Sequence, residues 1–272
     1  MERRGQPVSS QPTLAGRLER PTPPLGGLRS GLVRIEVRRL LRNRRTLIFT
    51  VIAPALFFLI FGLNSAYAGL RAGVGNISAS VLISMALYGA VLATTSGGAM
   101  VSLERAAGWS RQLRTTPLRP AAYVTIKMFS SLVLGGASVA VVYLVAVATG
   151  KPSMPVWVWV VSALAVWIGS LLFAAFGLFV GYLLPSENVM QAIGFVLMLF
   201  SFGGGLFIPL SQFSPALRTM AAFTPLYGLN QLVHYPLTQS GFVWSWVANL
   251  LVWLALFVAG AAWRFRRDTA RV

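Results

Sequence analysis

The stretch AGVGNISASVLISMALYGAVLATTSGGAMVSL, residues 72–103, contains no Asp, Glu, Lys or Arg. A helix rises about 1.5 Å per residue, so about 20 apolar residues cross a hydrocarbon core of about 30 Å. The stretch is longer than this minimum, and the charged pair Glu104-Arg105 follows it directly. It therefore predicts a membrane-spanning helix, centred near Leu87, that ends at a charged boundary.

The same pattern recurs along the chain. Five further uncharged runs cover residues 46–70, 128–150, 152–186, 188–217 and 219–263. One helix in each run, with centres near Leu56, Val139, Ile168, Val196 and Val252, predicts an all-α polytopic membrane protein with six transmembrane helices. The last run is too long for one span. Its first part is rich in Pro, Gly, Asn and Gln, which indicates a re-entrant or interfacial segment between spans 5 and 6 rather than another crossing.

Composition agrees with a membrane protein and argues against other classes. Of the 272 residues, 56% are hydrophobic and only 11% are charged, whereas soluble domains carry about 25% charged residues. The net charge of +17 is distributed in short blocks between long uncharged runs, so no nucleic-acid-binding face is expected. With no Cys, one His and six acidic residues, the chain offers little for metal binding or acid–base catalysis, and we expect no enzyme activity.

The positions of Lys and Arg predict the orientation. All but three of the 23 Lys and Arg residues precede span 1, lie between spans 2 and 3 or follow span 6; the exceptions are Arg71, Lys151 and Arg218. Basic residues concentrate in cytoplasmic segments. Six spans with this asymmetry place both termini in the cytoplasm.

The segment before span 1 has two parts. Residues 1–27 are rich in Pro and Arg and predict a disordered cytoplasmic tail or, alternatively, a docking arm for a partner. Within 28–45, apolar residues share one helical face, and Arg34, Arg38, Arg42 and Arg45 share another. This pattern predicts an amphipathic helix lying in the inner headgroup region, although a simple charge block that fixes the topology would also account for it. The transmembrane domain is expected over 28–267, with a short cytoplasmic tail at 268–272.

Individual residues within the apolar runs suggest local structure. Pro54 removes one backbone hydrogen bond in span 1 and requires a neighbour or water to satisfy the freed carbonyl. Gly177 and Gly181 are four residues apart in span 4 and permit close helix packing within the subunit. Glu187 is expected to stabilise the start of span 5, and His234 is expected to be packed or hydrated rather than a ligand.

The loop between spans 2 and 3 reads ERAAGWSRQLRTTPL, residues 104–118, and continues to Lys127. It is too charged to span a membrane and too rich in Trp and Leu for a free linker. We expect a short amphipathic helix that ends before Pro117. Such a helix either transmits force to a soluble partner or lies on the membrane.

This loop resembles that of the type-2 ABC transporter permeases. The matching residues are Glu104, Arg105, Gly108, Leu113, Thr116, Pro117, Leu118, Tyr123 and Lys127. Trp109 stands where the family usually has Thr, Arg111 falls near a position that is often acidic, and Ile126 replaces a Gly. The resemblance implies that the loop forms a coupling helix that docks into an ATPase subunit.

A second stretch strengthens the resemblance. Residues 201–210, SFGGGLFIPL, with Pro215 and with Thr224-Pro225-Leu226-Tyr227 farther along, are similar to the family's motif between spans 5 and 6. The resemblance implies short re-entrant helices that form an extracellular gate. The residues assigned to this gate are Gly203, Gly204, Gly205, Phe207, Pro209, Pro225 and Tyr227.

The chain lacks a phosphate-binding loop of the form G-x-x-x-x-G-K-[ST]. We therefore expect no cofactor on this chain; the resemblance places ATP and Mg²⁺ on a partner ABC ATPase. The family arrangement implies two ATPase copies and a second permease subunit, in a homodimer or heterodimer embedded in the lipid of a bacterial plasma membrane.

The leading hypothesis is ATP-driven export of a hydrophobic or amphipathic compound, as in the daunorubicin-resistance type of permease, with the clusters Gly97-Gly98 and Gly203–205 permitting a closable constriction. A lipid-linked glycan exporter is the alternative within the family. An ion-coupled carrier without an ATPase is the alternative from another class, although the centres of the predicted spans hold no ionisable residue.

Overall fold

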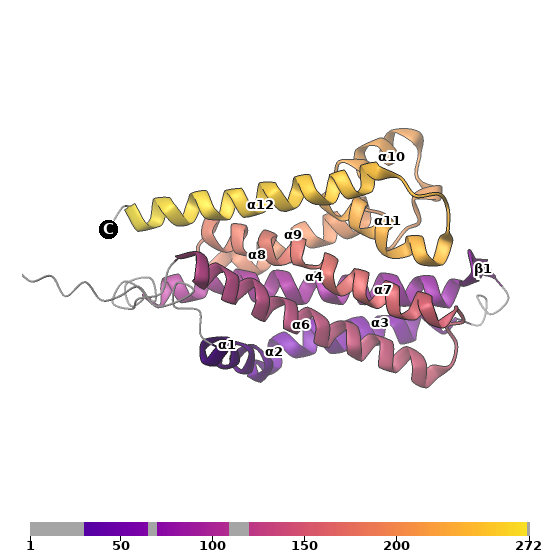
Figure 1. Ribbon diagram of the computed structural model, residues 1–272, viewed down its shortest axis with the longest axis horizontal. Helices are drawn as coiled ribbons and strands as arrows, with labels where there is room; N and C mark the ends of the chain where they lie inside the picture. Colours follow the sequence, from indigo (N-terminus) through magenta and orange to yellow (C-terminus); the bar gives the residue numbers. More distant parts are fainter. Residues whose placement is uncertain (1–29, 65–69, 109–119, 271–272) are drawn as a thin grey trace, which may run out of the picture.

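The chain folds into a bundle of helices, shown as a computed structural model that describes residues 30–64, 70–108 and 120–270 (Figure 1). The strands of the described part are β1 (Arg71–Ala72) and β2 (Gly75–Asn76), which form a small antiparallel hairpin. The longer helices are α1 (Ser30–Arg42), α3 (Ala53–Gly62), α4 (Ile77–Ala106), α6 (Pro120–Thr149), α7 (Val156–Gly169), α8 (Leu171–Leu183), α9 (Ser186–Gly203), α10 (Pro215–Ala222), α11 (Pro225–Thr238) and α12 (Trp244–Ala270). The short elements are α2 (Arg44–Leu47), a π-helix (Ile48–Ile52) and the 3₁₀-helix η4 (Leu210–Gln212).

Five helical segments are long and apolar enough to cross a membrane. They are Ile77–Ala106, Ala122–Thr149, Val156–Leu183, Ser186–Gly203 and Trp244–Phe265. The all-α polytopic fold predicted from the sequence is therefore confirmed.

The helix expected over 46–70 has a shorter apolar core, Ile48–Gly62. The whole helical segment Arg44–Gly62 nevertheless covers about 28 Å at about 1.5 Å per residue, close to the hydrocarbon thickness. The sixth span thus stays a prediction that this length supports.

Helix α4 lies at the centre of the bundle and contacts α3, α6, α7, α8, α9 and α11. Close packing against α8 depends on glycine: a Cβ on Gly98 would lie 2.5 Å from the Ala174 carbonyl oxygen, and one on Gly177 would lie 2.2 Å from the Thr95 carbonyl oxygen. The prediction that Gly177 permits packing within the subunit is confirmed. Gly98 serves the same contact, and Gly97 packs against Ser131 of α6. The role of Gly97-Gly98 in a constriction stays a prediction.

Pro54 lies in the first turn of α3, directly after the π-helix, within the continuous helical segment Arg44–Gly62. Since proline has no N–H, the Thr50 carbonyl four residues earlier loses its helical partner. The Ser138 hydroxyl of α6 donates to this carbonyl at 2.6 Å, and Ser138 is fully buried. A neighbouring helix therefore satisfies the carbonyl, as the sequence required.

The bundle has two distinct ends (Figure 1). Helix α1 and the end of α12 lie at one end, which we call the basic end, together with the end of α4. The hairpin β1–β2, α10 and α11 lie at the other, which we call the hairpin end.

Helix α11 extends from the interior to the hairpin end. Its Leu229 packs against Gly169, at the junction of α7 and α8, whereas the Leu237 carbonyl accepts a hydrogen bond from Val74 N at 2.9 Å. Helix α11 thus starts at about half the depth of the α7–α8 pair. This path is consistent with a re-entrant helix.

Candidate functional site at the basic end

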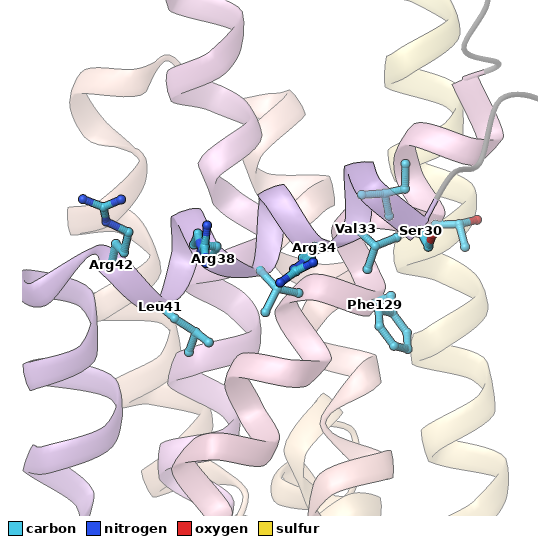
Figure 2. A pocket seen from close by; sticks show the side chains of 10 residues that line it. Ser30, Val33, Arg34, Arg38, Leu41, Arg42 and Phe129 are labelled. Atoms are coloured by element: carbon cyan, nitrogen blue, oxygen red, sulfur yellow. The ribbon is translucent and has the colours of Figure 1, made fainter.

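Helix α1 crosses the ends of the bundle helices at the basic end (Figure 2) and contacts α6. Its Leu40 is buried, at 3% exposure, whereas Arg34, Arg38 and Arg42 are exposed. The amphipathic helix predicted from residue 28 onward therefore exists, and it ends at Arg42. Asn43 separates it from α2 and accepts a hydrogen bond from Thr46 N at 3.2 Å, which caps α2. Arg45 lies in α2, but its side chain is outside the described residues.

A cluster of ionic side chains, which we call the ion cluster, joins α1 to the ends of α4 and α6. Glu104 accepts short hydrogen bonds from Arg39, Lys127 and the Tyr123 hydroxyl. Lys127 Nζ also contacts Glu36 Oε1 at 2.6 Å, and Arg39 Nη2 contacts the same oxygen at 3.0 Å. Two carboxylates are thus matched by two cations, with a phenol as an additional donor.

Burial makes this balance important. Glu104 is 8% exposed and Lys127 is 3% exposed, although both were predicted within a loop that contacts an ATPase. A buried charge is tolerated when it is paired and hydrogen-bonded, and removal of one partner leaves the other uncompensated. The pKa of the Arg39 guanidinium is raised, because its contacts with Glu104 and Glu36 outweigh the opposing effect of burial. Helix α1 is consequently held to α4 and α6 by fixed charges.

Arg105 connects the same end of α4 to α8. Its Nη1 donates to the carbonyl oxygens of Gly181 at 3.2 Å and Tyr182 at 3.0 Å, and the guanidinium lies 5.6 Å from the centroid of the Tyr182 ring. The last carbonyls of a helix have no helical partners and carry partial negative charge, so a cation stabilises them. Arg105 therefore links the α4 end to the end of span 4.

Gly108 ends α4. Its φ of +75° lies in the left-handed region, and its N–H donates to the Arg105 carbonyl at 3.0 Å. A Cβ there would meet nothing within 4 Å, so the requirement for glycine is conformational rather than spatial. The next predicted coupling residues, Trp109, Leu113, Thr116 and Pro117, lie outside the described residues. The structure therefore describes the residues on both sides of the loop: Gly108 before it and the start of α6 after it.

Two members of the ion cluster, Glu36 and Arg39, were absent from the sequence prediction. Glu36 is the one acidic residue of α1, on a helix that carries four arginines at positions 34, 38, 39 and 42. Glu36 and Arg39 are three residues apart on one helix, and this spacing could have predicted their pairing. The second partner of Glu36, Lys127, depends on the fold.

At the hairpin end, the predicted gate residues lie where α9, α10 and α11 meet. Gly204 follows α9 and donates to the Phe200 carbonyl at 2.7 Å, and Gly205 adopts a φ of +78° that turns the chain. The Phe207 ring lies 5.1 Å from the ring of Tyr88 on α4, and Pro225 occupies the first turn of α11. Pro209 precedes the 3₁₀-helix η4, and Tyr227 is half-buried in α11.

Polar side chains hold this end together, and its described part contains no carboxylate. Arg218 of α10 donates from Nε to the Leu210 carbonyl at 2.8 Å and from Nη2 to the Ser211 carbonyl at 2.7 Å. Asn230 Nδ2 donates to the Gly204 carbonyl at 3.1 Å. Asn249 of α12 accepts from Gly228 N at 3.2 Å and donates to the carbonyls of Ala222 and Thr224 at 2.9 and 3.2 Å. His234 lies between the Asn230 carbonyl, at 2.9 Å, and the Ser84 hydroxyl, at 3.2 Å, which agrees with a packed histidine. Asn249 was not predicted, because an Asn within an apolar run gives no sign of its partners.

These features define a multi-pass helical membrane protein in which the ion cluster holds α1 to the ends of α4 and α6. The sequence matches the family described as ABC-2 type transporter over residues 30–237. The chain belongs to this family. It is also 23% identical, over 237 residues, to the Bacillus subtilis (strain 168) protein named "Putative transport permease YvfS"; the alignment covers 86% of this chain and 96% of that protein. The resemblance to type-2 ABC permeases found in the sequence is thereby confirmed, and the chain is a membrane permease subunit.

Proposed function

We propose that this permease is the membrane-spanning subunit of an ATP-driven exporter of a hydrophobic or amphipathic compound, working with two copies of an ABC ATPase and a second permease subunit. Family membership supports the partnership with an ABC ATPase. ATP and Mg²⁺ would bind to the ATPase. The basic end would face the cytoplasm of a bacterium, because most Lys and Arg residues lie on that side.

The observation that carries the proposal is the ion cluster. Glu104 precedes the 109–119 loop in the sequence and Lys127 follows it. Their ion pairs join both flanks of the loop to α1. A force on the loop from an ATPase would therefore reach α1, α4 and α6 together, and Arg105 would pass it to α8. Such a rigid connection is what coupling of ATP hydrolysis to helix movement requires.

The hairpin end would contain the gate. Helix α11 starts inside the bundle and ends beside the β1–β2 hairpin, so its movement would open or close a path at this end. The apolar faces of α9 and α12 expose large side chains, among them Phe195, Leu199, Leu251 and Leu256. These faces would contact lipid and the second permease subunit.

The test is co-purification in mild detergent with the ABC ATPase encoded beside this chain, followed by measurement of ATP hydrolysis with and without the permease. Stable association with altered hydrolysis is expected. A complex that forms with wild-type chain but hydrolyses ATP at the rate of the isolated ATPase would contradict coupling.

The alternative from another class is an ion-coupled carrier. Within the five described spans, Asp, Glu, Lys and Arg lie only near the span ends, as with Glu104, Lys127 and Glu187. Central ionisable residues are the usual sites of ion coupling, so this distribution favours the exporter. Transport that survives ATP depletion but stops when the proton gradient collapses would support the carrier. A lipid-linked glycan remains the alternative substrate, and direct transport assays with both substrate classes distinguish the two.

A further inference from the structure

A groove lies between α1 and the first turns of α6, at the basic end (Figure 2). Its volume is about 810 Å³, within the range of about 300–1,000 Å³ that is typical of ligand pockets. The apolar part of its wall consists of Val33, Val37 and Leu41 from α1 and Ile126 and Phe129 from α6. The groove therefore offers an apolar ligand a surface on two sides.

The groove opens toward the face of α6 that would meet lipid. Phe129 is 52% exposed, although it lies within the membrane-spanning segment Ala122–Thr149. In a membrane, an aromatic ring exposed on a spanning helix would contact the lipid hydrocarbon. An acyl chain could consequently enter the groove from the bilayer without crossing water.

Three arginines border the same groove: Arg34, Arg38 and Arg42 lie one helical turn apart on α1. Figure 2 shows Arg38 and Arg42 on one side of α1, with Leu41 and Phe129 toward the other. Within the part of the chain that the structure describes, none of these three guanidinium groups is paired with a carboxylate, whereas Arg39 is bound in the ion cluster. The groove thus combines an apolar wall with an unpaired cationic rim.

We infer that this groove binds an anionic phospholipid of the leaflet at the basic end, with an acyl chain between α1 and α6 and its phosphate at Arg34, Arg38 and Arg42. Guanidinium groups bind phosphate by charge-assisted hydrogen bonds. Each basic residue near an anionic membrane surface strengthens binding about fivefold. The lipid would complete the attachment of α1 on the side opposite the ion cluster. The inference requires membrane insertion but not an ATPase partner.

The primary test is native mass spectrometry of the delipidated full chain, titrated with dioleoyl phosphatidylglycerol or with dioleoyl phosphatidylcholine. We expect one saturable site that prefers the anionic lipid. The variant R34Q/R38Q/R42Q should weaken this binding by up to about a hundredfold. The control R44Q/R71Q/K151Q removes the same charge from exposed positions outside the groove. Equal loss in both variants would mean unspecific attraction and would overturn the inference.

A second pair of variants tests the apolar wall at constant charge. V33W narrows the groove, whereas L144W adds the same ring to a position on α6 that is 68% exposed and outside it. Only V33W should lose the anionic lipid. Glycerol 1-phosphate should not compete, because it lacks the acyl chain; competition at equal strength would instead indicate a site for a soluble anion. Unchanged lipid binding in V33W, or full occupation of the groove by the copurified ATPase, would also refute the lipid site.

Discussion

The two ends of the bundle are held by different interactions. At the basic end, the ion cluster brings together side chains from three helices that are distant in sequence, and Glu104 lies at its centre. At the hairpin end, the described contacts include no ion pair: glycines, asparagines and the Arg218 guanidinium bond backbone carbonyls, as around Gly204 and Asn249. Charged contacts are few and strongly interdependent, while neutral contacts are numerous and individually weaker. Loss of one charged side chain should therefore destabilise all the contacts of the basic end. Loss of one neutral contact at the hairpin end should lower the stability only by the contribution of that contact.

The largest effect is expected at Glu104. The variant E104Q leaves Lys127 and Arg39 with only Glu36 as a described carboxylate partner, so the cluster carries an excess buried positive charge. Breaking a buried ion pair typically costs about 3–5 kcal/mol. We expect a large decrease in thermal stability in detergent, together with loss of transport and of ATPase stimulation, while membrane insertion persists.

Two variants make the Glu104 experiment specific. E104Q/K127Q restores the charge balance and should recover part of the stability that E104Q alone loses. E187Q removes an exposed carboxylate from the first turn of α9 and should cost at most about 1 kcal/mol, the usual strength of a helix-dipole interaction. Additive losses in the double variant would show that Glu104 and Lys127 do not interact.

An intermediate effect is expected at the hairpin end, from G204L. A Cβ on Gly204 would lie 2.8 Å from the Phe200 carbonyl oxygen and 2.9 Å from Leu226 Cβ, so α9 and α11 would have to separate. Overpacking of this kind costs about 1–3 kcal/mol. Export should stop while the ATPase partner stays bound, because the ion cluster is unchanged.

The control for G204L is G194L on the same helix. A Cβ on Gly194 meets nothing within 4 Å in the chain, so the stability of the isolated subunit should be nearly unchanged. Release of the ATPase by G204L, or normal efflux in that variant, would place the gate elsewhere.

The comparison of the two ends also shows what a sequence can predict. Apolar runs and charged boundaries are local, and they correctly predicted the helical fold and the end of the second span near Glu104. Local chemistry also predicted that the carbonyl freed by Pro54 needs a donor. That Ser138 supplies it, or that Glu36 meets Lys127, depends on helix packing between residues far apart in sequence. The long-range partners of a motif residue therefore require the fold.

The positions of motif residues can also mislead about their contacts. The resemblance placed Glu104 and Lys127 in a loop that docks into an ATPase, but both side chains point into the subunit. In this structure, their ion pair holds the two ends of the loop together. The docking surface itself is expected among the loop residues between those ends.

The smallest effect is expected at Ser138, in the interior between the two ends. S138A removes the donor to the Thr50 carbonyl, and hydrogen bonds between membrane helices contribute about 0.6 kcal/mol on average. In a P54A background, the new N–H at position 54 can bond the same carbonyl within the helix, so S138A should then cost almost nothing. A double-mutant cycle measured by unfolding in detergent isolates this term. An S138A cost that is the same in both backgrounds would mean that the hydroxyl stabilises the bundle by packing and not by its bond to the Thr50 carbonyl.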